Sequence, residues 1–131
     1  MENKTVSLDL IIPIEESLIS RNLQFFERNF DFSKIGIIPI VSFRGEYILG
    51  DGHHRLFCLY EQGIREWEFS IAFNEDLGKL NQGIFRDFSS IEQITLQYVH
   101  FWKHDLDNLG IRRIWDYHPS KLGRKSCKFA F

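Results

Sequence analysis

The segment 50–55, Gly-Asp-Gly-His-His-Arg, has the residue types of a turn that binds phosphate. It separates an apolar stretch with strand character from a stretch with helical character, so it is predicted to open a helix. The first N–H groups of a helix lack partners within it, and the helix dipole places partial positive charge at that end, which attracts phosphate. The glycines let the backbone turn sharply and approach a ligand closely. Arg55 adds a guanidinium that binds phosphate oxygens in pairs.

The residues of this turn are predicted to have different tasks. Gly52, His53, His54 and Arg55 are predicted to bind phosphate, and His54 is also a candidate catalytic base, depending on its protonation. Asp51 would repel a bare anion, so we expect it to bind a Mg²⁺ ion that also contacts phosphate, or to orient a histidine. A zinc site is rejected because ligand pairs on a helix stand three or four residues apart. The alternative is an ordinary polar helix cap.

A longer stretch around this turn resembles a known superfamily. Residues 39–41 (Pro-Ile-Val), 47–55 (Tyr-Ile-Leu-Gly-Asp-Gly-His-His-Arg) and 61–63 (Glu-Gln-Gly) are similar to the core of the ParB/sulfiredoxin superfamily, with recognisable similarity over about residues 6–73. The resemblance implies a small mixed-sheet domain whose strand-turn-helix unit binds nucleotide phosphates. His53 stands where sulfiredoxins carry a catalytic cysteine, and the Gly-Glu-Arg-Arg of CTP-binding ParB proteins is replaced. The string Asp-Gly-His-His-Arg is intact, as in the free serine kinases.

A second match involves residues 13–15, Pro-Ile-Glu. The free serine kinases carry Pro-x-Glu after their first strand, so the resemblance implies that Glu15 is the catalytic base of a kinase. Such a kinase would use ADP or ATP with Mg²⁺ and phosphorylate a hydroxyl acceptor such as free serine. From the residues alone, Glu15 is also a favourable helix-opening carboxylate, and Glu16 offers the same chemistry. The alternative functions are a nucleotide-binding ParB-like regulatory or DNA-associated module without kinase activity, or a nuclease.

Hydrophobic periodicity predicts the elements that position this turn. Strands are expected at 6–12, 37–43, 46–50 and 67–73, with a hairpin at Arg44-Gly45, and helices at 16–30, 53–62 and 89–109. Ser89 and Glu92 have the pattern of a capping box, and residues 74–88 are predicted to be a loop. Adjacent strands without an intervening helix argue against a doubly wound sheet. We therefore predict one α+β domain over residues 1–131.

Composition and charge narrow the class of protein. With 131 residues, 44% of them hydrophobic and 26% charged, the chain has the profile of one globular domain. Cys58 and Cys127 form neither a disulfide framework nor a zinc pattern; Cys58 is predicted to be buried, and a cytoplasmic location is expected. No signal peptide or membrane span is predicted. Residues 112–131 carry six basic residues and one acidic residue. This basic tail is predicted to contact nucleic acid, to close over an anionic ligand, or to be a solvated end.

Overall fold

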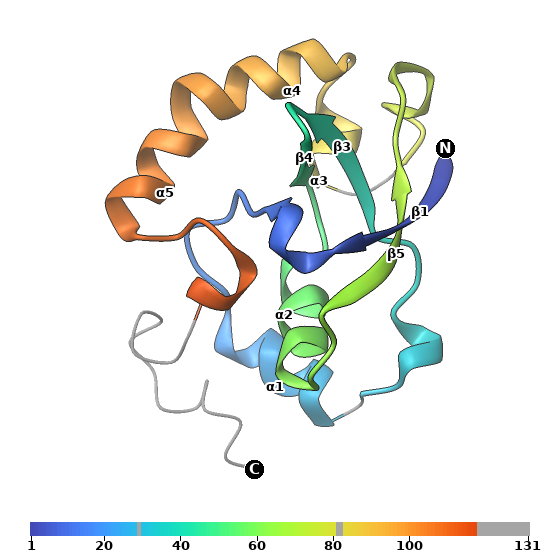
Figure 1. Cartoon of the computed structure of the whole chain (residues 1–131), viewed down its shortest axis with the longest axis vertical. Coiled ribbons are helices and arrows are strands. Elements are labelled where there is room, and N and C mark those ends of the chain that lie inside the picture. Colours follow the sequence, from blue (N-terminus) through green and yellow to red (C-terminus); the bar gives the residue numbers. More distant parts are fainter. Residues whose placement is uncertain (29, 81–82, 118–131) are drawn as a thin grey trace.

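Five strands form one mixed sheet in the computed structural model, which describes residues 1–28, 30–80 and 83–117. The strands are β1 (Glu2–Ser7), β2 (Ile11–Ile12), β3 (Pro39–Phe43), β4 (Glu46–Leu49) and β5 (Glu66–Ile71). Their order across the sheet is β1-β5-β3-β4-β2 (Figure 1). The β1–β5 and β3–β4 pairs are antiparallel, whereas β3–β5 and β2–β4 are parallel. The predicted α+β class is confirmed.

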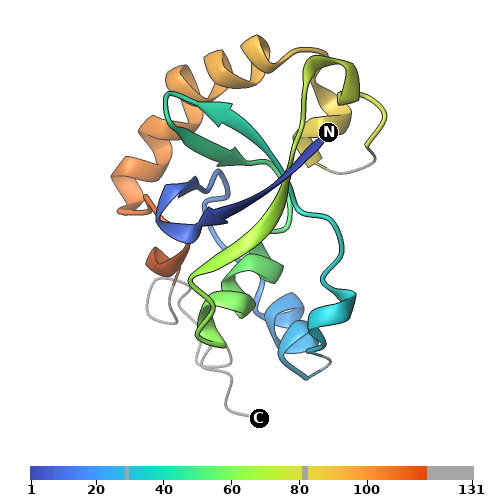
Figure 2. The ribbon, with the colours of Figure 1, turned by 45° about the vertical axis from the view of Figure 1, so that its right-hand side comes forward.

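The first predicted strand, 6–12, is two strands on opposite edges of the sheet. A 3₁₀ turn at Leu8–Leu10 separates β1 from β2, and the Ser7 hydroxyl accepts a hydrogen bond from the N–H of Asp9 at 3.3 Å. Three residues span only about 10 Å when extended, so the two edges must lie close together and the sheet must curl strongly (Figure 2). The prediction of one continuous strand was wrong because the residues on both sides of the turn are apolar, so the sequence pattern is that of a single strand.

The centre of the chain follows the predictions from local turn chemistry. The β3–β4 hairpin turns at Arg44 and Gly45, whose φ angles of +48° and +84° are the two left-handed positions of a type I′ turn. Helix α2 (His53–Glu61) then begins after Gly52 and stops before Gly63, where φ is +91°. The N–H of Ile64 donates to the carbonyl of Leu59 at 3.1 Å. This bond satisfies a terminal carbonyl of α2, as expected at a glycine C-cap.

Helix α1 (Ser20–Arg28) begins four residues later than predicted. The N–H of Ile19 donates to Nε2 of His54 at 2.9 Å, so it does not enter a helical hydrogen-bond ladder. The carbonyl of Ile19 instead accepts the first helical bonds, from Asn22 and Leu23. Residues 13–19 are therefore a loop that a side chain of α2 holds in place.

The C-terminal part of the described chain forms a long helical arm, residues 91–109. It consists of α4 (Ile91–Gln97), a π-helical turn (Tyr98–Trp102) and α5 (Lys103–Leu109), and it ends at Gly110 as predicted. Its N-cap is Ser90, whose hydroxyl accepts from the N–H of Gln93 at 3.2 Å, so the predicted Ser89–Glu92 capping box was wrong by one position. The predicted loop 74–88 also contains a 3₁₀ turn at Asn74–Asp76 and helix α3 (Gly83–Asp87).

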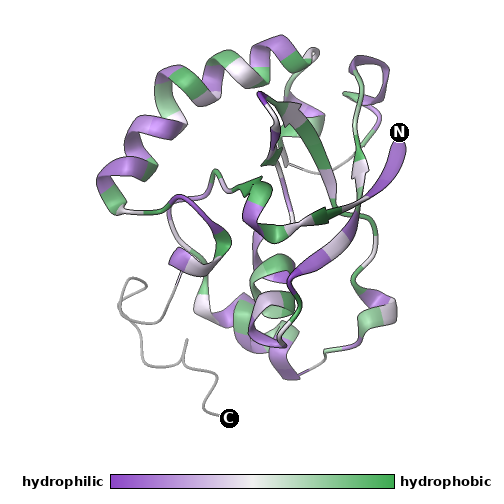
Figure 3. Ribbon diagram, viewed as in Figure 1, coloured by the Kyte–Doolittle hydropathy of each residue, from purple (hydrophilic) through white to green (hydrophobic). Residues whose placement is uncertain are grey.

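Apolar clusters cover both faces of the sheet. Ile40 and Leu49 belong to the cluster under α1 and α2, while Val41 and Ile48 belong to the cluster under α3 and α4. Successive residues of a strand point to opposite faces, so β3 and β4 require apolar residues at adjacent positions. Figure 3 shows apolar and polar residues alternating along the helical arm. No helix within the described ranges is long and apolar enough to cross a membrane.

Candidate phosphate-binding site

The turn between β4 and α2 is built around glycines with different physical roles. A Cβ on Gly50 would stand 2.4 Å from Cγ1 of Ile84, so this glycine is required by direct packing of α3 on the turn. Gly52 has φ +88°, a left-handed conformation that disfavours other residues, and it is the N-cap of α2. Gly50 therefore serves packing, and Gly52 sets the direction in which α2 leaves the turn.

The first turn of α2 has N–H groups to offer a ligand. Its first helical bond runs from the N–H of Leu56 to the carbonyl of Gly52 at 2.9 Å. Within the described part of the chain, the N–H groups of His53, His54 and Arg55 have no hydrogen-bond partner. Helix geometry directs these groups out of the N-terminal end of α2, where the dipole is positive. This arrangement suits an anion such as phosphate.

The ring of His53 is fully buried, so its side chain is not open to a phosphate group. Its Nε2 accepts a hydrogen bond from the N–H of Ile14 at 2.9 Å, which places the ring proton on Nδ1. Burial, and secondarily the neighbouring His54, lower the pKa of His53 to about 3, so the ring is neutral. Its Nδ1 lies 3.5 Å from Oε1 of Glu15. The predicted phosphate contact of His53 is thereby limited to its main-chain N–H, and its ring positions residues 14–15.

His54 has a comparable role one position later. Its half-buried ring accepts the N–H of Ile19 at Nε2, 2.9 Å away. Burial lowers the pKa of His54, and Asp51 partly opposes this shift. Because a neutral imidazole has one acceptor nitrogen, the hydrogen bond to Ile19 occupies the atom that a catalytic base would use. His54 therefore offers a ligand its Nδ1–H, and of the two predicted catalytic residues only Glu15 has an acceptor atom that this hydrogen bond does not occupy.

Glu15 lies beside the buried ring of His53, in the loop 13–19. Its side chain is 40% exposed, and burial, followed by the charge of Asp51, raises the pKa of its carboxyl group. The buried Tyr117 hydroxyl donates to the main-chain carbonyl of Glu15. Sequence reasoning missed this contact, because no local pattern connects residues 102 positions apart. The raised pKa makes Glu15 a stronger base than an ordinary glutamate.

Arg55 links the turn to the loop before β3. Its Nη1 donates to the carbonyl of Ile35 at 2.7 Å and more weakly to that of Ile37 at 3.5 Å. Its Nη2 lies 3.6 Å from Oδ2 of Asp51. The guanidinium therefore has a structural task on one side, and its Nη2 side faces the turn, where a phosphate group would bind.

A pocket of about 240 Å³ opens at this turn, and we call it the α2 pocket. Its lining comprises four of the five predicted residues of the turn, without His53, and two residues of α1: Asn22, Phe26, Asp51, Gly52, His54 and Arg55. Asn22 and Phe26 stand four positions apart on one face of α1. That spacing is visible in the sequence, but the packing of α1 against α2 is not. Glu15 and the ring of His53 lie outside the lining.

The carboxylates of the site suit a magnesium ion only in company with phosphate. Among the residues that the structure describes, no group of three histidine, cysteine, aspartate or glutamate side chains stands close enough to hold a metal ion. Mg²⁺ is commonly bound by one or two carboxylates together with substrate phosphates. Asp51, which lines the α2 pocket, supplies one such carboxylate. A nuclease centre built on clustered carboxylates receives no comparable support from the described residues.

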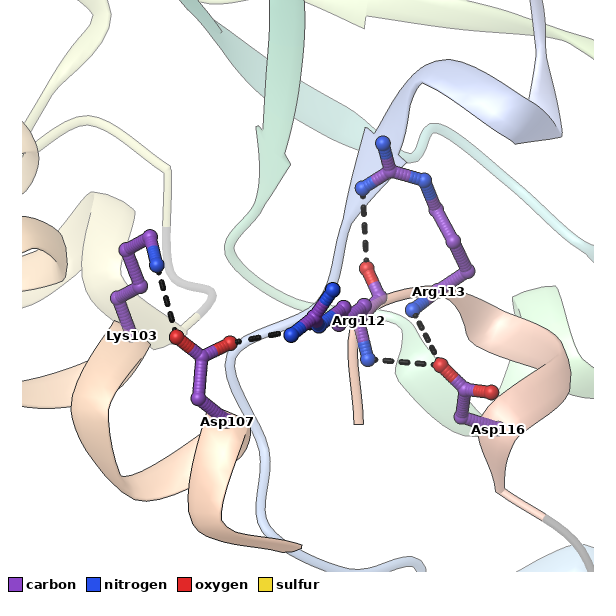
Figure 4. Close-up of polar contacts among 5 residues, drawn as sticks. All are labelled: Lys103, Asp107, Arg112, Arg113 and Asp116. Carbon is purple, nitrogen blue, oxygen red and sulfur yellow. Dashed lines mark hydrogen bonds and ion pairs between the residues drawn. The ribbon is translucent and has the colours of Figure 1, made fainter. Parts of the chain in front are cut away.

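Of the basic tail 112–131, only residues 112–117 lie within the described part of the chain. Arg113 contacts the carboxylate of Glu46, and Nε of Arg112 lies 3.7 Å from Asp107, which also accepts from Lys103 at 2.7 Å. Figure 4 shows the side chains of Lys103 and Arg112 on the carboxylate of Asp107, and the main-chain N–H groups of Arg112 and Arg113 on the carboxylate of Asp116. The first two basic residues of the tail thus have carboxylate partners, with Arg112 sharing Asp107 with Lys103, and the other four lie outside the described residues.

Solved structures that are partly similar to this chain include two whose functions their descriptions do not state. No family model and no curated protein matches the chain. Protein Atu1540 from Agrobacterium tumefaciens is 18% identical with a TM-score of 0.48, and the match covers 55% of this chain and 39% of that one. A conserved hypothetical protein from Pyrococcus furiosus is 28% identical with a TM-score of 0.47, over 55% of this chain and 32% of that one. The match therefore spans 39% of the length of the first protein and 32% of the length of the second.

Proposed function

We propose that this protein binds a nucleotide by its phosphates at the first turn of α2 and transfers the terminal phosphoryl group to a small hydroxyl acceptor. The observation that carries the proposal is the position of Glu15, a carboxylate of raised pKa, beside an open helix N-terminus. Phosphoryl transfer needs a base for the acceptor and fixed positive charge for the phosphates, and little else from the protein. The resemblance to the free serine kinases points to serine as the acceptor.

In this proposal the phosphates occupy the α2 pocket. The main-chain N–H groups of residues 53–55 and Nη2 of Arg55 bind phosphate oxygens. Glu15 accepts the proton of the acceptor hydroxyl while the oxygen of that hydroxyl bonds to the terminal phosphorus. The bond from that phosphorus to the bridging oxygen breaks, and the shortened nucleotide leaves with the electron pair. Mg²⁺, held by Asp51 and phosphate oxygens, would neutralise charge on the nucleotide.

His53 acts in this proposal as a positioning residue. Its Nε2 is taken by Ile14, so its Nδ1–H is fixed in the direction of Glu15. The present separation of 3.5 Å is too long for a strong hydrogen bond. A shift of a few tenths of an ångström on binding would close it, and the neutral donor would then steady the carboxylate without cancelling its charge.

Calorimetry with ADP, ATP and CTP, with and without Mg²⁺, tests the binding step, and an assay of phosphate transfer to serine tests the chemistry. Arg55→Ala should weaken nucleotide binding. Glu15→Gln should leave nucleotide affinity unchanged and lower the transfer rate by about 10²- to 10⁴-fold, the usual contribution of a general base. Glu16→Gln is the matched control and should behave as wild type. Absence of binding to every nucleotide would overturn the proposal.

A nucleotide-binding module without turnover is the second candidate. It is favoured by the two carbonyl contacts of Arg55, which commit part of the guanidinium to holding the loop before β3. Such a module would bind nucleotide in the same pocket, and Glu15→Gln would not change its nucleotide affinity. Tight nucleotide binding without phosphate transfer to any acceptor would favour the binding module over the kinase.

A further inference from the structure

A second pocket lies beside the α2 pocket, between the end of α1 and the 3₁₀ turn at Phe32–Lys34. Its volume is also about 240 Å³, and we call it the aromatic pocket. Three phenylalanines and an isoleucine supply its apolar walls, with one acidic and one basic residue: Phe25, Phe26, Phe30, Ile35, Asp31 and Lys34. The proposed phosphate chemistry makes no use of it.

The two pockets are joined by one shared residue and one hydrogen bond. Phe26 lines both of them. Arg55 lines the α2 pocket, and its Nη1 donates at 2.7 Å to the carbonyl of Ile35, which lines the aromatic pocket. Sites for whole small molecules commonly span about 300 to 1,000 Å³. Each pocket alone is below that range, and the two together fall within it, as expected for one ligand with a polar end and an aromatic end.

We propose that the aromatic pocket binds the base of the nucleotide whose phosphates occupy the α2 pocket, and that it favours bases with an exocyclic amino group. This inference rests on the proposed function, because it places the second end of the same ligand. Figure 1 shows α1 beside α2, and α1 contributes residues to both pockets.

The walls of the aromatic pocket suit a flat ring. Phe25 is 61% exposed, and Phe26 meets it edge-on with ring centroids 5.7 Å apart. Phe30 packs edge-on against Phe32 at 4.7 Å, and Phe32 in turn contacts Trp67 at 6.2 Å, so the other wall is supported by the sheet. Exposed phenylalanine rings on a supported wall are the usual platform for stacking a nucleobase.

The polar residues of the pocket indicate which bases it selects. Oδ1 of Asp31 accepts from the N–H and the hydroxyl of Ser33, at 2.9 and 2.7 Å. These bonds hold the pKa of Asp31 below its usual range, so the group stays an ionised acceptor. Within the described residues Oδ2 has no hydrogen-bond donor, and it can accept from an amino group. Adenine, guanine and cytosine carry such a group, whereas uracil has no exocyclic amino group, and its one ring N–H lies between two carbonyl oxygens that a carboxylate repels.

Calorimetry with ATP, UTP and inorganic tripolyphosphate separates base binding from phosphate binding. Phe25→Ala should weaken ATP binding roughly 5- to 100-fold, the effect of losing one aromatic–base stack, and leave tripolyphosphate binding unchanged. Phe101→Ala removes a phenylalanine of similar exposure, 58%, from the helical arm and should change neither affinity. Asp31→Asn, which keeps an acceptor for Ser33, should reduce the preference for ATP over UTP.

The outcomes distinguish this inference from the proposed function. If tripolyphosphate binds and Phe25→Ala leaves ATP affinity unchanged, the phosphate site stands and the base pocket is refuted. If wild type binds ATP and UTP equally and Asp31→Asn changes nothing, the amino-group selectivity is refuted. If neither tripolyphosphate nor any nucleotide binds, the proposed function and the base pocket fall together.

Discussion

The buried ring of His53 should make stability depend on pH in a defined direction. Its pKa in the folded protein is about 3, and an unfolded histidine has a pKa of about 6.5. Between these values the unfolded chain binds a proton that the folded protein excludes, so the free energy of unfolding decreases as the pH falls. The stabilisation is fully present above about pH 6.5. With partial protonation near that value, the loss between pH 7 and pH 5 is about 2 kcal/mol.

Urea unfolding at pH 7, 6 and 5 measures this loss in wild type and in His53→Gln. Glutamine keeps an acceptor for the N–H of Ile14 and does not titrate. We expect wild type to lose about 2 kcal/mol more than His53→Gln between pH 7 and pH 5. His100→Gln, which replaces an exposed ring on the π-helical turn, should follow wild type. Equal losses in wild type and His53→Gln would refute the argument that burial keeps the ring neutral.

Three further measurements test the packing around the site. Gly52→Ala would place a Cβ 3.1 Å from a guanidinium nitrogen at φ +88°, and Gly63→Ala would place one in open space at φ +91°. Each substitution should lower the free energy of unfolding, measured with urea, by about 1–2 kcal/mol. Only Gly52→Ala should weaken nucleotide binding, and equal nucleotide affinities of the two variants would contradict this. Gly50→Ala should lower the free energy of unfolding by about 1–3 kcal/mol, because the new Cβ would collide with α3. An unchanged Tm would argue against that packing. In a Cys127→Ser variant, Cys58 should resist thiol reagents until the protein unfolds, because burial raises its pKa to about 12; labelling of the native protein would disprove it.

The part of the fold that was predicted correctly depends on local chemistry. The Arg44-Gly45 hairpin and the boundaries of α2 follow from residues that set their own backbone angles. Gly110 ends the helical arm for the same reason. The burial of Cys58 was also predicted, because its neighbours are apolar in sequence. These features require no knowledge of distant contacts.

The boundaries that were wrong depend on contacts between distant segments. Helix α1 begins late because a histidine of α2 takes the N–H of Ile19. The strand predicted at 6–12 divides because its two halves pair with β5 and β4, on opposite edges of a curled sheet. Periodicity describes which residues are apolar, but it does not reveal which partner each segment finds.

The candidate site also combines features that follow from neighbouring residues with features that depend on contacts between distant segments. The sequence by itself determined that a glycine-bounded helix N-terminus would stand beside Asp51 and Arg55, because these residues are neighbours in the chain. Only the tertiary structure decided that the ring of His53 faces inward, that Tyr117 reaches Glu15, and that α1 contributes the opposite wall of the pocket. The physical reason is that exposure, pKa and hydrogen-bond partners are properties of packed surfaces, which form only when segments far apart in the chain meet.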